Sequence, residues 1–245
     1  MIIYKYRYFG LIGVFTLFLT LSTLINYFVT SSYNTIITDN QLIVNNDEEF
    51  IVIIDAGHGG ADPGAVASDG TLEKDLNLVF ANIIGKYISD QGIKVIYTRD
   101  TDRALHIEGS QLSKKTQDLK ARVQIANTHK NGIFVSVHMN KFSDDSVNGL
   151  QVWYSSNGRL SQILADSIQS NVARCVQTNN KRETKKDSNS IYVLKNAQIP
   201  AVLVECGFVS NEEELNLLKN KDYQQNLSKS IANGILIYLG EKIIG

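Results

Sequence analysis

The sequence predicts an α/β fold: a single domain built on a largely parallel sheet of roughly six strands with helices on both faces, preceded by an N-terminal membrane segment. Short continuous apolar runs, which are typical of strands buried on both faces, alternate with longer segments whose apolar residues recur every three or four positions. Repeated strand–helix units favour parallel pairing of the strands. Of the 245 residues, residues 50–242 are assigned to this domain, which is long enough to bury one large core.

The N-terminus is predicted to be a signal anchor or a signal peptide, over residues 1–30. Basic side chains there precede an uncharged, largely apolar stretch that starts at Tyr8, and about 20 such residues span the hydrocarbon core of a bilayer. Basic residues before the segment keep that end in the cytoplasm, so the rest of the chain is expected outside it. Because no A-x-A cleavage site follows, an uncleaved anchor is favoured. Residues 31–49 are polar and mixed, as in a linker.

The first predicted strand, Phe50–Asp55, is a continuous apolar run that leads into a glycine-rich loop reaching Gly70. Thr71 is a candidate N-cap for the helix that follows, and Gly92 ends this helix before the second strand, Ile93–Thr98. The helix is predicted to bury a stripe of apolar side chains at helical spacing, namely Leu72, Leu76, Val79, Phe80, Ile83, Ile84, Tyr87 and Ile88.

The remainder of the chain continues the alternation. A helix near Lys115–Thr128 precedes the third strand, Ile133–Val137, and the alternating residues of Leu150–Tyr154 predict an edge or near-edge strand. Asn211 is expected to cap a later helix. The other predicted elements are, in order, the helix Leu160–Val176, the strand Pro200–Glu205, the helix Glu212–Leu218 and the helix Asp222–Leu239.

Charge and cysteine content narrow the classes of function. The net charge is −1, so nothing indicates a nucleic-acid partner or a polybasic membrane surface. Two cysteines, Cys175 and Cys206, exclude a disulfide-stapled scaffold, and the sequence leaves open whether they pair. We interpret Cys206 as a buried, inert thiol.

Four polar side chains stand where predicted strands end or a predicted helix begins. His58, His138 and Glu205 follow apolar runs, and Glu73 lies in the first turn of the helix behind the His58 loop. Functional sites of parallel sheets form at the carboxyl ends of the strands. Two imidazoles and one carboxylate are the ligand set of a catalytic zinc with an open position for water, and a further free carboxylate suits proton transfer from that water. The sequence therefore predicts a zinc hydrolase.

Glu73, His138 and the loop around His58 each have an alternative interpretation. A lone glutamate such as Glu73 is commonly a surface acid stabilised by the helix dipole, and a lone histidine such as His138 is commonly a satisfied core residue. The glycine-rich loop around His58 resembles a phosphate cradle, but it lacks both G-x-G-x-x-G and G-x-x-x-x-G-K-S/T. The other histidines, His106 and His129, are interpreted as surface residues.

Several motifs occur in order over about residues 50–240: Asp55-Ala-Gly-His58-Gly-Gly, Glu73 with Lys74 and Asn77, Thr98-Arg99-Asp100 with Asp102, Leu119-x-x-Arg122-x-x-x-Ala126-Asn127, Ser136-Val-His138-Met-Asn140, Gly149-Leu-Gln-Val-Trp-Tyr154 and Val204-Glu205-Cys-Gly207-Phe-Val-Ser-Asn211. In this order and spacing the chain resembles the zinc-dependent N-acetylmuramoyl-L-alanine amidases of bacterial cell walls. It is most similar to the CwlD-type, germination-specific amidases of sporulation.

The resemblance implies that residues 50–242 form a zinc amidase catalytic domain. It implies one Zn²⁺ held by His58, Glu73 and His138, with Glu205 as the catalytic carboxylate. The implied reaction is hydrolysis of the amide bond between N-acetylmuramic acid and the L-alanine of the stem peptide in peptidoglycan. In the CwlD-type branch this occurs in spore cortex and leads to muramic lactam. The protein is then expected on the extracytoplasmic face of the membrane or in the cell wall or spore envelope.

Further candidates support the ligands or bind substrate. Asp55 is predicted to orient the His58 imidazole, and Asn140 lies two residues after His138. Arg99 and Arg122 are candidates for holding a peptide carboxylate, with loop-fixing ion pairs as the alternative. Where the family usually has a small residue, this chain has Met139, which either narrows the site or fills a gap.

Other functions remain open at the level of sequence. One alternative is another zinc hydrolase of wall components, such as a carboxypeptidase or a deacetylase. The other is a non-catalytic, membrane-tethered protein that binds or regulates the wall. The stretch after His138 is short, so a long insertion that covers the zinc, as in some relatives, is not expected. An activating protein partner is a further possibility that the sequence does not identify.

Overall fold

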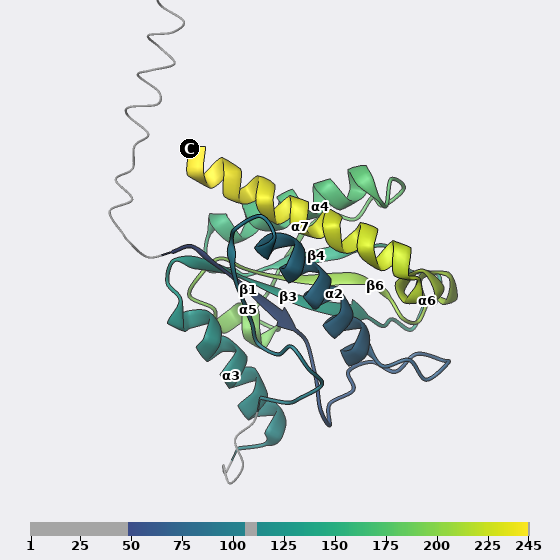
Figure 1. Cartoon of the computed structure of the whole chain (residues 1–245). Helices are drawn as coiled ribbons and strands as arrows, with labels where there is room; N and C mark the ends of the chain where they lie inside the picture. The colour runs from purple at the N-terminus through teal and green to yellow at the C-terminus, as the bar shows by residue number, and fades with distance from the viewer. Residues whose placement is uncertain (1–48, 106–111, 245) are drawn as a thin grey trace, which may run out of the picture. The chain divides into compact units, whose positions relative to one another are not determined.

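The computed structural model describes residues 49–105 and 112–244, and side chains up to residue 240 (Figure 1). The predicted membrane segment, all but the last residue of the predicted linker, and His106 lie outside the described residues. Within the described part, the helices fall short of the length and apolar character that a membrane span needs.

A six-stranded sheet forms the centre of the described part, with the strand order β2-β1-β3-β6-β4-β5. The strands are β1 (Ile51–Ala56), β2 (Lys94–Tyr97), β3 (Gly132–Asn140), β4 (Gln151–Tyr154), β5 (Lys185–Lys186) and β6 (Ala201–Phe208). The neighbours β2, β1, β3 and β6 pair in parallel, whereas β4 runs antiparallel to β6 and parallel to β5.

The sheet is therefore mixed, and the prediction of a largely parallel sheet holds for four of its six strands. The connection from β3 to β4 explains the reversal. Residues 141–150 contain no helix, so β4 begins near the end of the sheet where β3 finishes and runs back in the opposite direction. Helix α4 (Arg159–Cys175) then separates β4 from β5 as a crossover, and those two strands are parallel.

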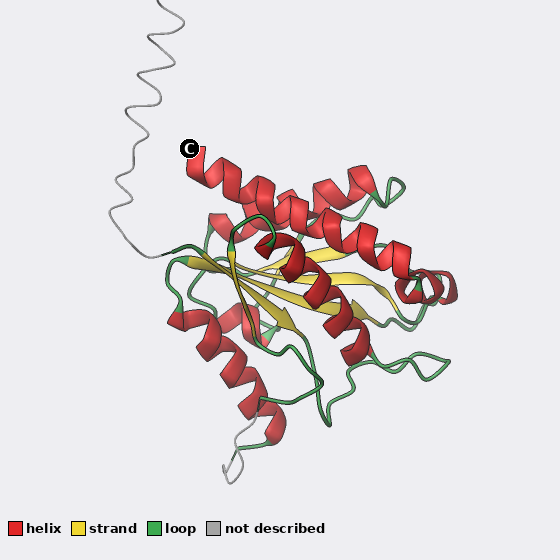
Figure 2. Ribbon diagram, in the orientation of Figure 1, coloured by secondary structure: helices red, strands yellow, loops and turns green. Residues whose placement is uncertain are grey.

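Helices cover both faces of the sheet, as predicted (Figure 2). The other helices are α2 (Glu73–Ser89), α3 (Lys114–Thr128), α5 (Tyr192–Asn196), α6 (Glu212–Lys219) and α7 (Lys221–Ile244). Along β1, Val52 and Ile54 face one hydrophobic cluster with side chains of α2, α4 and α7, while Ile53 faces a second cluster with side chains of α3 and α5. Figure 1 shows α4 with α7 on one side of the sheet and α3 with α5 on the other.

The start of α2 differs from the prediction. Its N-cap is Leu72, which makes no side-chain capping bond, so the prediction for Thr71 was wrong. The backbone N–H of Glu73 instead donates to the carbonyl of Ala65 across the preceding loop, at 2.9 Å. Val79, predicted to be buried, is 38% exposed, and the buried stripe of α2 includes the polar residues Glu73 and Asn77. One end of this stripe therefore faces a polar site rather than the core.

Two strands continue past their predicted ends. Strand β3 reaches Asn140 and β6 reaches Phe208, so His138 and Glu205 lie within paired strands, in register with each other. Asn211 caps α6 as predicted, because its side chain accepts a hydrogen bond from the backbone N–H of Glu214.

Candidate metal centre

Three potential metal ligands converge at the carboxyl ends of β1 and β3. His58 lies in the loop after β1, Glu73 is the first residue of α2, and His138 lies near the end of β3. One ligand atom from each of these residues lies within 4.8 Å of the other two. Segments that are distant in the sequence thus place two imidazoles and a carboxylate around one point.

The contacts identify which atoms face that point. Glu73 Oε1 lies 3.3 Å from His58 Nε2 and 2.9 Å from His138 Nδ1. The two imidazole rings are nearly perpendicular, at 77°, with their centroids 5.0 Å apart. The three atoms are therefore arranged as donors to one small cation, with His58 using Nε2 and His138 using Nδ1.

Two glycines make room for this cluster. A Cβ atom on Gly57 would lie 2.2 Å from the Cε1 and Nε2 atoms of His138, so that ring packs directly on the Gly57 backbone. A Cβ on Gly64 would lie 2.5 Å from Glu73 Oε2 and 2.7 Å from His58 Cδ2. His58 itself has a positive φ of 61°, a conformation that is uncommon outside glycine. The sequence Gly-His-Gly-Gly thus forms a tight turn that directs the His58 imidazole toward the His138 imidazole.

Asp62 is a functional candidate that the sequence reasoning missed. Its Oδ2 lies 2.9 Å from His58 Nδ1, the ring nitrogen that does not face Glu73. A carboxylate on the far nitrogen of a ligand imidazole fixes the ring and its tautomer. Burial acts to lower the pKa of His58, but the carboxylates of Glu73 and Asp62 raise it to about 8.

Glu73 is held by backbone donors as well as by the imidazoles. Its Oε2 accepts from Ala65 N at 2.7 Å, and its Oε1 lies 3.3 Å from Met139 N. Asn77, one helical turn later, donates to the same Oε1 at 3.2 Å. Burial acts to raise the pKa of Glu73, but His138 and His58 bring it below its usual value. A carboxylate that is 4% exposed and faces two imidazoles is a donor set suited to a divalent cation.

Asp55 does not orient the His58 imidazole, contrary to the prediction. It is 1% exposed, and its carboxylate accepts hydrogen bonds from Thr98, Ser136 and Arg122. Burial acts to raise the pKa of Asp55, but Arg122 and the two hydroxyl donors lower it.

Arg99 and Arg122 are buried, with exposures of 0% and 2%, so a role in binding a peptide carboxylate is not supported. Arg99 donates to the carbonyls of Ala56 and Gly57, at 2.8 and 2.9 Å. Arg122 donates to the carbonyls of Ala56 and His58, at 2.7 and 2.6 Å. Both guanidinium groups thus fix the backbone around His58, which agrees with the loop-fixing alternative.

Replacing Arg122 by methionine is expected to lower the free energy of unfolding by about 3–5 kcal/mol, because Asp55 would remain as a buried charge without its cation. Urea denaturation monitored by circular dichroism measures this change. The matched control is Lys86→Met, which breaks an exposed pair with Asp90 and should leave the unfolding midpoint almost unchanged. Equal midpoints for the two variants would contradict the role given to Arg122.

Glu205 lies beside the three ligands. Its Cα is in register with that of His138 across the β3–β6 pair. Its Oε2 atom is inaccessible to solvent and has no hydrogen-bond partner. Burial raises the pKa of Glu205 to about 7. The charges of His138 and His58 act to lower this pKa, and the charge of Glu73 acts to raise it. An orphaned carboxylate oxygen next to a set of metal ligands suits a group that exchanges protons.

The remaining candidates take less direct positions. Asn140 is half-buried at the end of β3, where its carbonyl accepts from Val209 N at 2.8 Å. Met139 is 2% exposed and belongs to the core, so it fills a gap rather than narrowing the site. His129 is half-buried at the C-terminal end of α3, so part of its side chain is at the surface.

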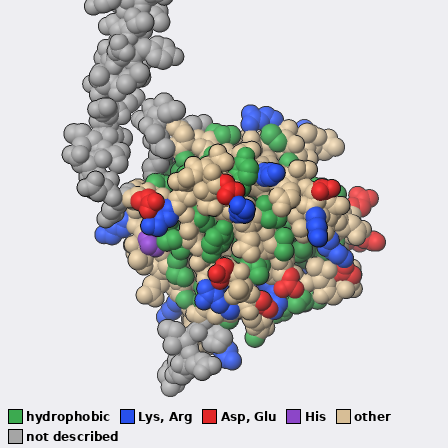
Figure 3. All heavy atoms as spheres, in the orientation of Figure 1, with side chains coloured by type: hydrophobic (Ala, Val, Ile, Leu, Met, Phe, Trp, Pro, Cys, Tyr) green, Lys and Arg blue, Asp and Glu red, His purple; other side chains and the backbone are tan. Residues whose placement is uncertain are grey.

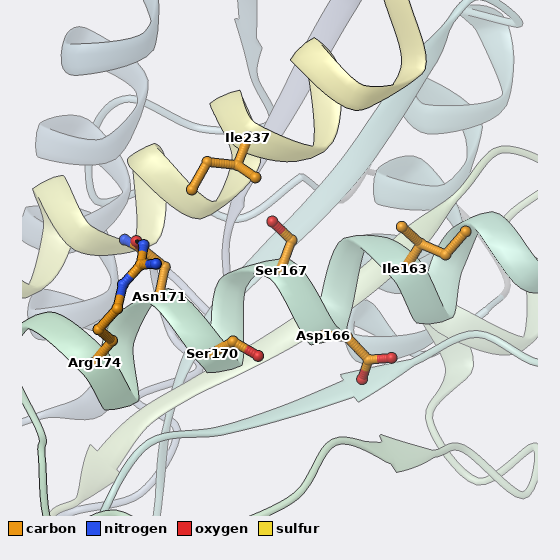
Figure 4. Close-up of a pocket in the computed structure, with 7 residues that line it drawn as sticks. All are labelled: Ile163, Asp166, Ser167, Ser170, Asn171, Arg174 and Ile237. Carbon is orange, nitrogen blue, oxygen red and sulfur yellow. Dashed lines mark hydrogen bonds between the residues drawn. The ribbon is translucent and has the colours of Figure 1, made fainter. Parts of the chain in front are cut away.

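Three other features of the described residues bear on function: the cysteines, the surface charges and a groove. Cys206 is buried, Cys175 is exposed, and both are free thiols. Figure 3 shows acidic and basic side chains interspersed on the visible face. Figure 4 shows a groove in which residues of α4, such as Ser167 and Arg174, lie opposite Ile237 of α7. This groove includes none of the four residues of the candidate centre.

This chain is similar in sequence and structure to known cell-wall amidases. A family profile described as N-acetylmuramoyl-L-alanine amidase matches residues 52–236. The germination-specific N-acetylmuramoyl-L-alanine amidase of Bacillus subtilis (strain 168) is 36% identical over 194 residues, which cover 78% of this chain and 81% of the relative.

Solved structures give the same result. The CwlD amidase from Clostridioides difficile, solved in complex with the GerS lipoprotein, is 39% identical with a TM-score of 0.74, and the match covers 78% of this chain and 98% of that one. The N-acetylmuramoyl-L-alanine amidase AmiC2 of Nostoc punctiforme is 32% identical with a TM-score of 0.68, covering 80% and 99%. Fold, site and sequence together show that this chain belongs to the N-acetylmuramoyl-L-alanine amidase family.

Proposed function

We propose that this protein is a zinc-dependent amidase that hydrolyses the bond between N-acetylmuramic acid and the L-alanine of the stem peptide in peptidoglycan. One Zn²⁺ would be held by His58 Nε2, Glu73 Oε1 and His138 Nδ1. The observation that carries the proposal is the convergence of these three atoms within 4.8 Å beside the unpartnered carboxylate oxygen of Glu205. Membership of the amidase family supports the choice of bond.

When bound, zinc supplies a Lewis acid that polarises the amide carbonyl and makes a water molecule acidic near neutral pH. Glu205 takes the proton from this water as the water oxygen bonds to the carbonyl carbon. It then passes the proton to the amide nitrogen as the carbon–nitrogen bond breaks, which releases the stem peptide with a free amino group. Asp62 keeps the His58 ring in the tautomer that presents Nε2 to the metal.

We also propose a cellular setting. The germination-specific relative and the CwlD amidase favour spore cortex as the substrate and formation of muramic lactam as the consequence. The N-terminal segment, residues 1–30, would anchor the chain or direct its export. A linker of residues 31–49 would join this segment to the catalytic domain, residues 50–242, outside the cytoplasm. The CwlD amidase forms a complex with the GerS lipoprotein, and this complex favours a lipoprotein partner for this chain. We propose that such a partner would activate the enzyme.

Digestion of purified peptidoglycan by the zinc-loaded protein, with mass analysis of the fragments, tests the proposal. The expected products are intact stem peptides whose L-alanine has a free amino group, and glycan strands whose muramic acid residues carry free lactyl carboxyl groups. Release of terminal amino acids would indicate a carboxypeptidase, and release of acetate would indicate a deacetylase. Binding of peptidoglycan without any cleavage, at full zinc occupancy, would favour a non-catalytic protein.

A further inference from the structure

Strand β6 has an irregularity directly after Glu205. The register pairs His138 with Glu205 and then Asn140 with Phe208, so between these two pairs one residue of β3 lies opposite two residues of β6. An extra residue of this kind is a β-bulge, which bends its strand and changes the direction of neighbouring side chains. The direction of the Glu205 carboxylate therefore depends on what holds this bulge in place.

The carboxylate of Glu214 lies at the bulge. Glu214 belongs to the first turn of α6 and is 8% exposed. Its Oε2 accepts from the backbone N–H of Phe208, the residue that closes the bulge, at 2.7 Å. Its Oε1 accepts from the backbone N–H of Gly149 at 2.9 Å. One buried side chain thus joins the end of β6 to the segment that enters β4.

That second contact also bears on Glu205. Gln151, two residues after Gly149, is the Cα partner of Glu205 in the antiparallel pair of β4 and β6. The Glu214 carboxylate therefore ties β6, the strand that carries Glu205, to the segment that enters its neighbour β4. His138 flanks Glu205 on the other side, through the register of β3.

The surroundings are shaped to receive this carboxylate. A Cβ atom on Gly207, within the bulge, would lie 3.3 Å from Cδ, Oε1 and Oε2 of Glu214, which is tighter than an ordinary contact. Asn211 fixes the start of α6 by accepting from Glu214 N at 2.9 Å. The guanidinium of Arg182 covers the Phe208 ring at 4.8 Å and donates to the carbonyl of Asn148 at 2.7 Å.

We infer that Glu214 is a positioning residue for Glu205: its carboxylate fixes the β6 bulge through Phe208 and Gly149, and thereby sets the direction in which Glu205 faces the metal centre. This inference rests on the proposed function, because it assigns Glu214 to the proton-transferring group of that reaction. The ligands His58, Glu73 and His138 come from other segments, so Glu214 has no direct part in holding the metal.

The test compares Glu214→Gln with Glu212→Gln and Glu213→Gln. All three changes remove one acidic charge from the first turn of α6, but Glu212 and Glu213 are exposed. The amide of the new glutamine keeps one acceptor oxygen and turns an N–H group toward the other backbone N–H. We expect Glu214→Gln to keep one zinc per chain and the wild-type KM. Its kcat for a soluble muropeptide should fall by about 10²-fold. The two controls should match the wild type.

A double mutant shows whether the effect passes through Glu205. In a Glu205→Ala background, adding Glu214→Gln should cause no further loss of kcat, because the group that it positions is already absent. A further loss of the same factor would overturn the inference, as would a normal kcat or a parallel loss of zinc in Glu214→Gln. Gly207→Ala, which presses on the Glu214 carboxylate without removing it, should reproduce the kcat loss in milder form.

The outcomes separate this inference from the proposed function. If the zinc-loaded wild type fails to cleave muropeptide, the proposed function fails. If the wild type cleaves, Glu205→Ala does not, and Glu214→Gln behaves as the wild type, only the role of Glu214 fails. If both Glu214→Gln and Gly207→Ala lose the folded state, Glu214 is a structural residue alone and the inference is wrong.

Discussion

Replacing Glu205 by glutamine is expected to lower kcat for muropeptide hydrolysis by about 10²–10⁴-fold while one zinc per chain stays bound. Glutamine has nearly the same shape, but it does not accept a proton at neutral pH. The zinc content should hold because the three candidate ligands are His58, Glu73 and His138. The loss should appear in kcat rather than in KM, because proton transfer belongs to the transition state.

Metal analysis and steady-state kinetics on the same preparation measure both quantities. Glu183→Gln is the matched control, because Glu183 is an exposed acid on the loop before β5 and should tolerate the change. A Glu205→Gln protein that carries zinc and turns over as fast as the control would remove Glu205 from the mechanism. The orphaned, buried Oε2 atom would then need another explanation.

Replacing Gly57 by alanine is expected to weaken zinc binding at least about 10-fold and to lower activity at limiting zinc with it. The added methyl group would lie 2.2 Å from the His138 ring, far inside the contact distance of two carbon atoms, so the imidazole must move away from Glu73 and His58. If the His138 imidazole moves away, only His58 and Glu73 remain as ligands, and two ligands hold zinc poorly. The effect acts on the metal and leaves the charge of the protein unchanged.

Zinc titration by calorimetry and zinc content after dialysis measure the loss. Gly158→Ala is the matched control, because a Cβ at Gly158 meets nothing within 4 Å. Gly57→Ala should bind zinc at least about 10-fold more weakly than this control, within the range known for disturbed ligand support. Wild-type zinc affinity in Gly57→Ala would mean that His138 does not hold the metal in the arrangement described.

Three of the four central residues were predictable from a simple rule about sheets. His58, His138 and Glu205 each follow an apolar run, and parallel strands bring their carboxyl ends to one edge. The structure places all three together with Glu73. The helices on both faces and the cap at Asn211 were also predictable, because each depends on a local sequence pattern.

The errors arose where tertiary contacts decide. The direction of β4 depends on the helix-free connection at residues 141–150, which carries no periodic signal. Asp62, rather than Asp55, contacts the His58 ring because glycine-rich turns bend the chain back, and spacing alone gives no measure of that bend. Arg122 looked available for substrate, yet it is buried against Asp55, and sequence does not reveal which side of a helix receives a buried ion pair.

We propose that two imidazoles and one carboxylate hold a zinc ion in front of Glu205. Crystals grown with zinc, measured above and below the zinc absorption edge, test it most directly. We predict one strong anomalous peak bounded by His58 Nε2, Glu73 Oε1 and His138 Nδ1, with the Glu205 carboxylate facing it. A peak at another position, or these side chains directed away from one another at full zinc occupancy, would contradict it.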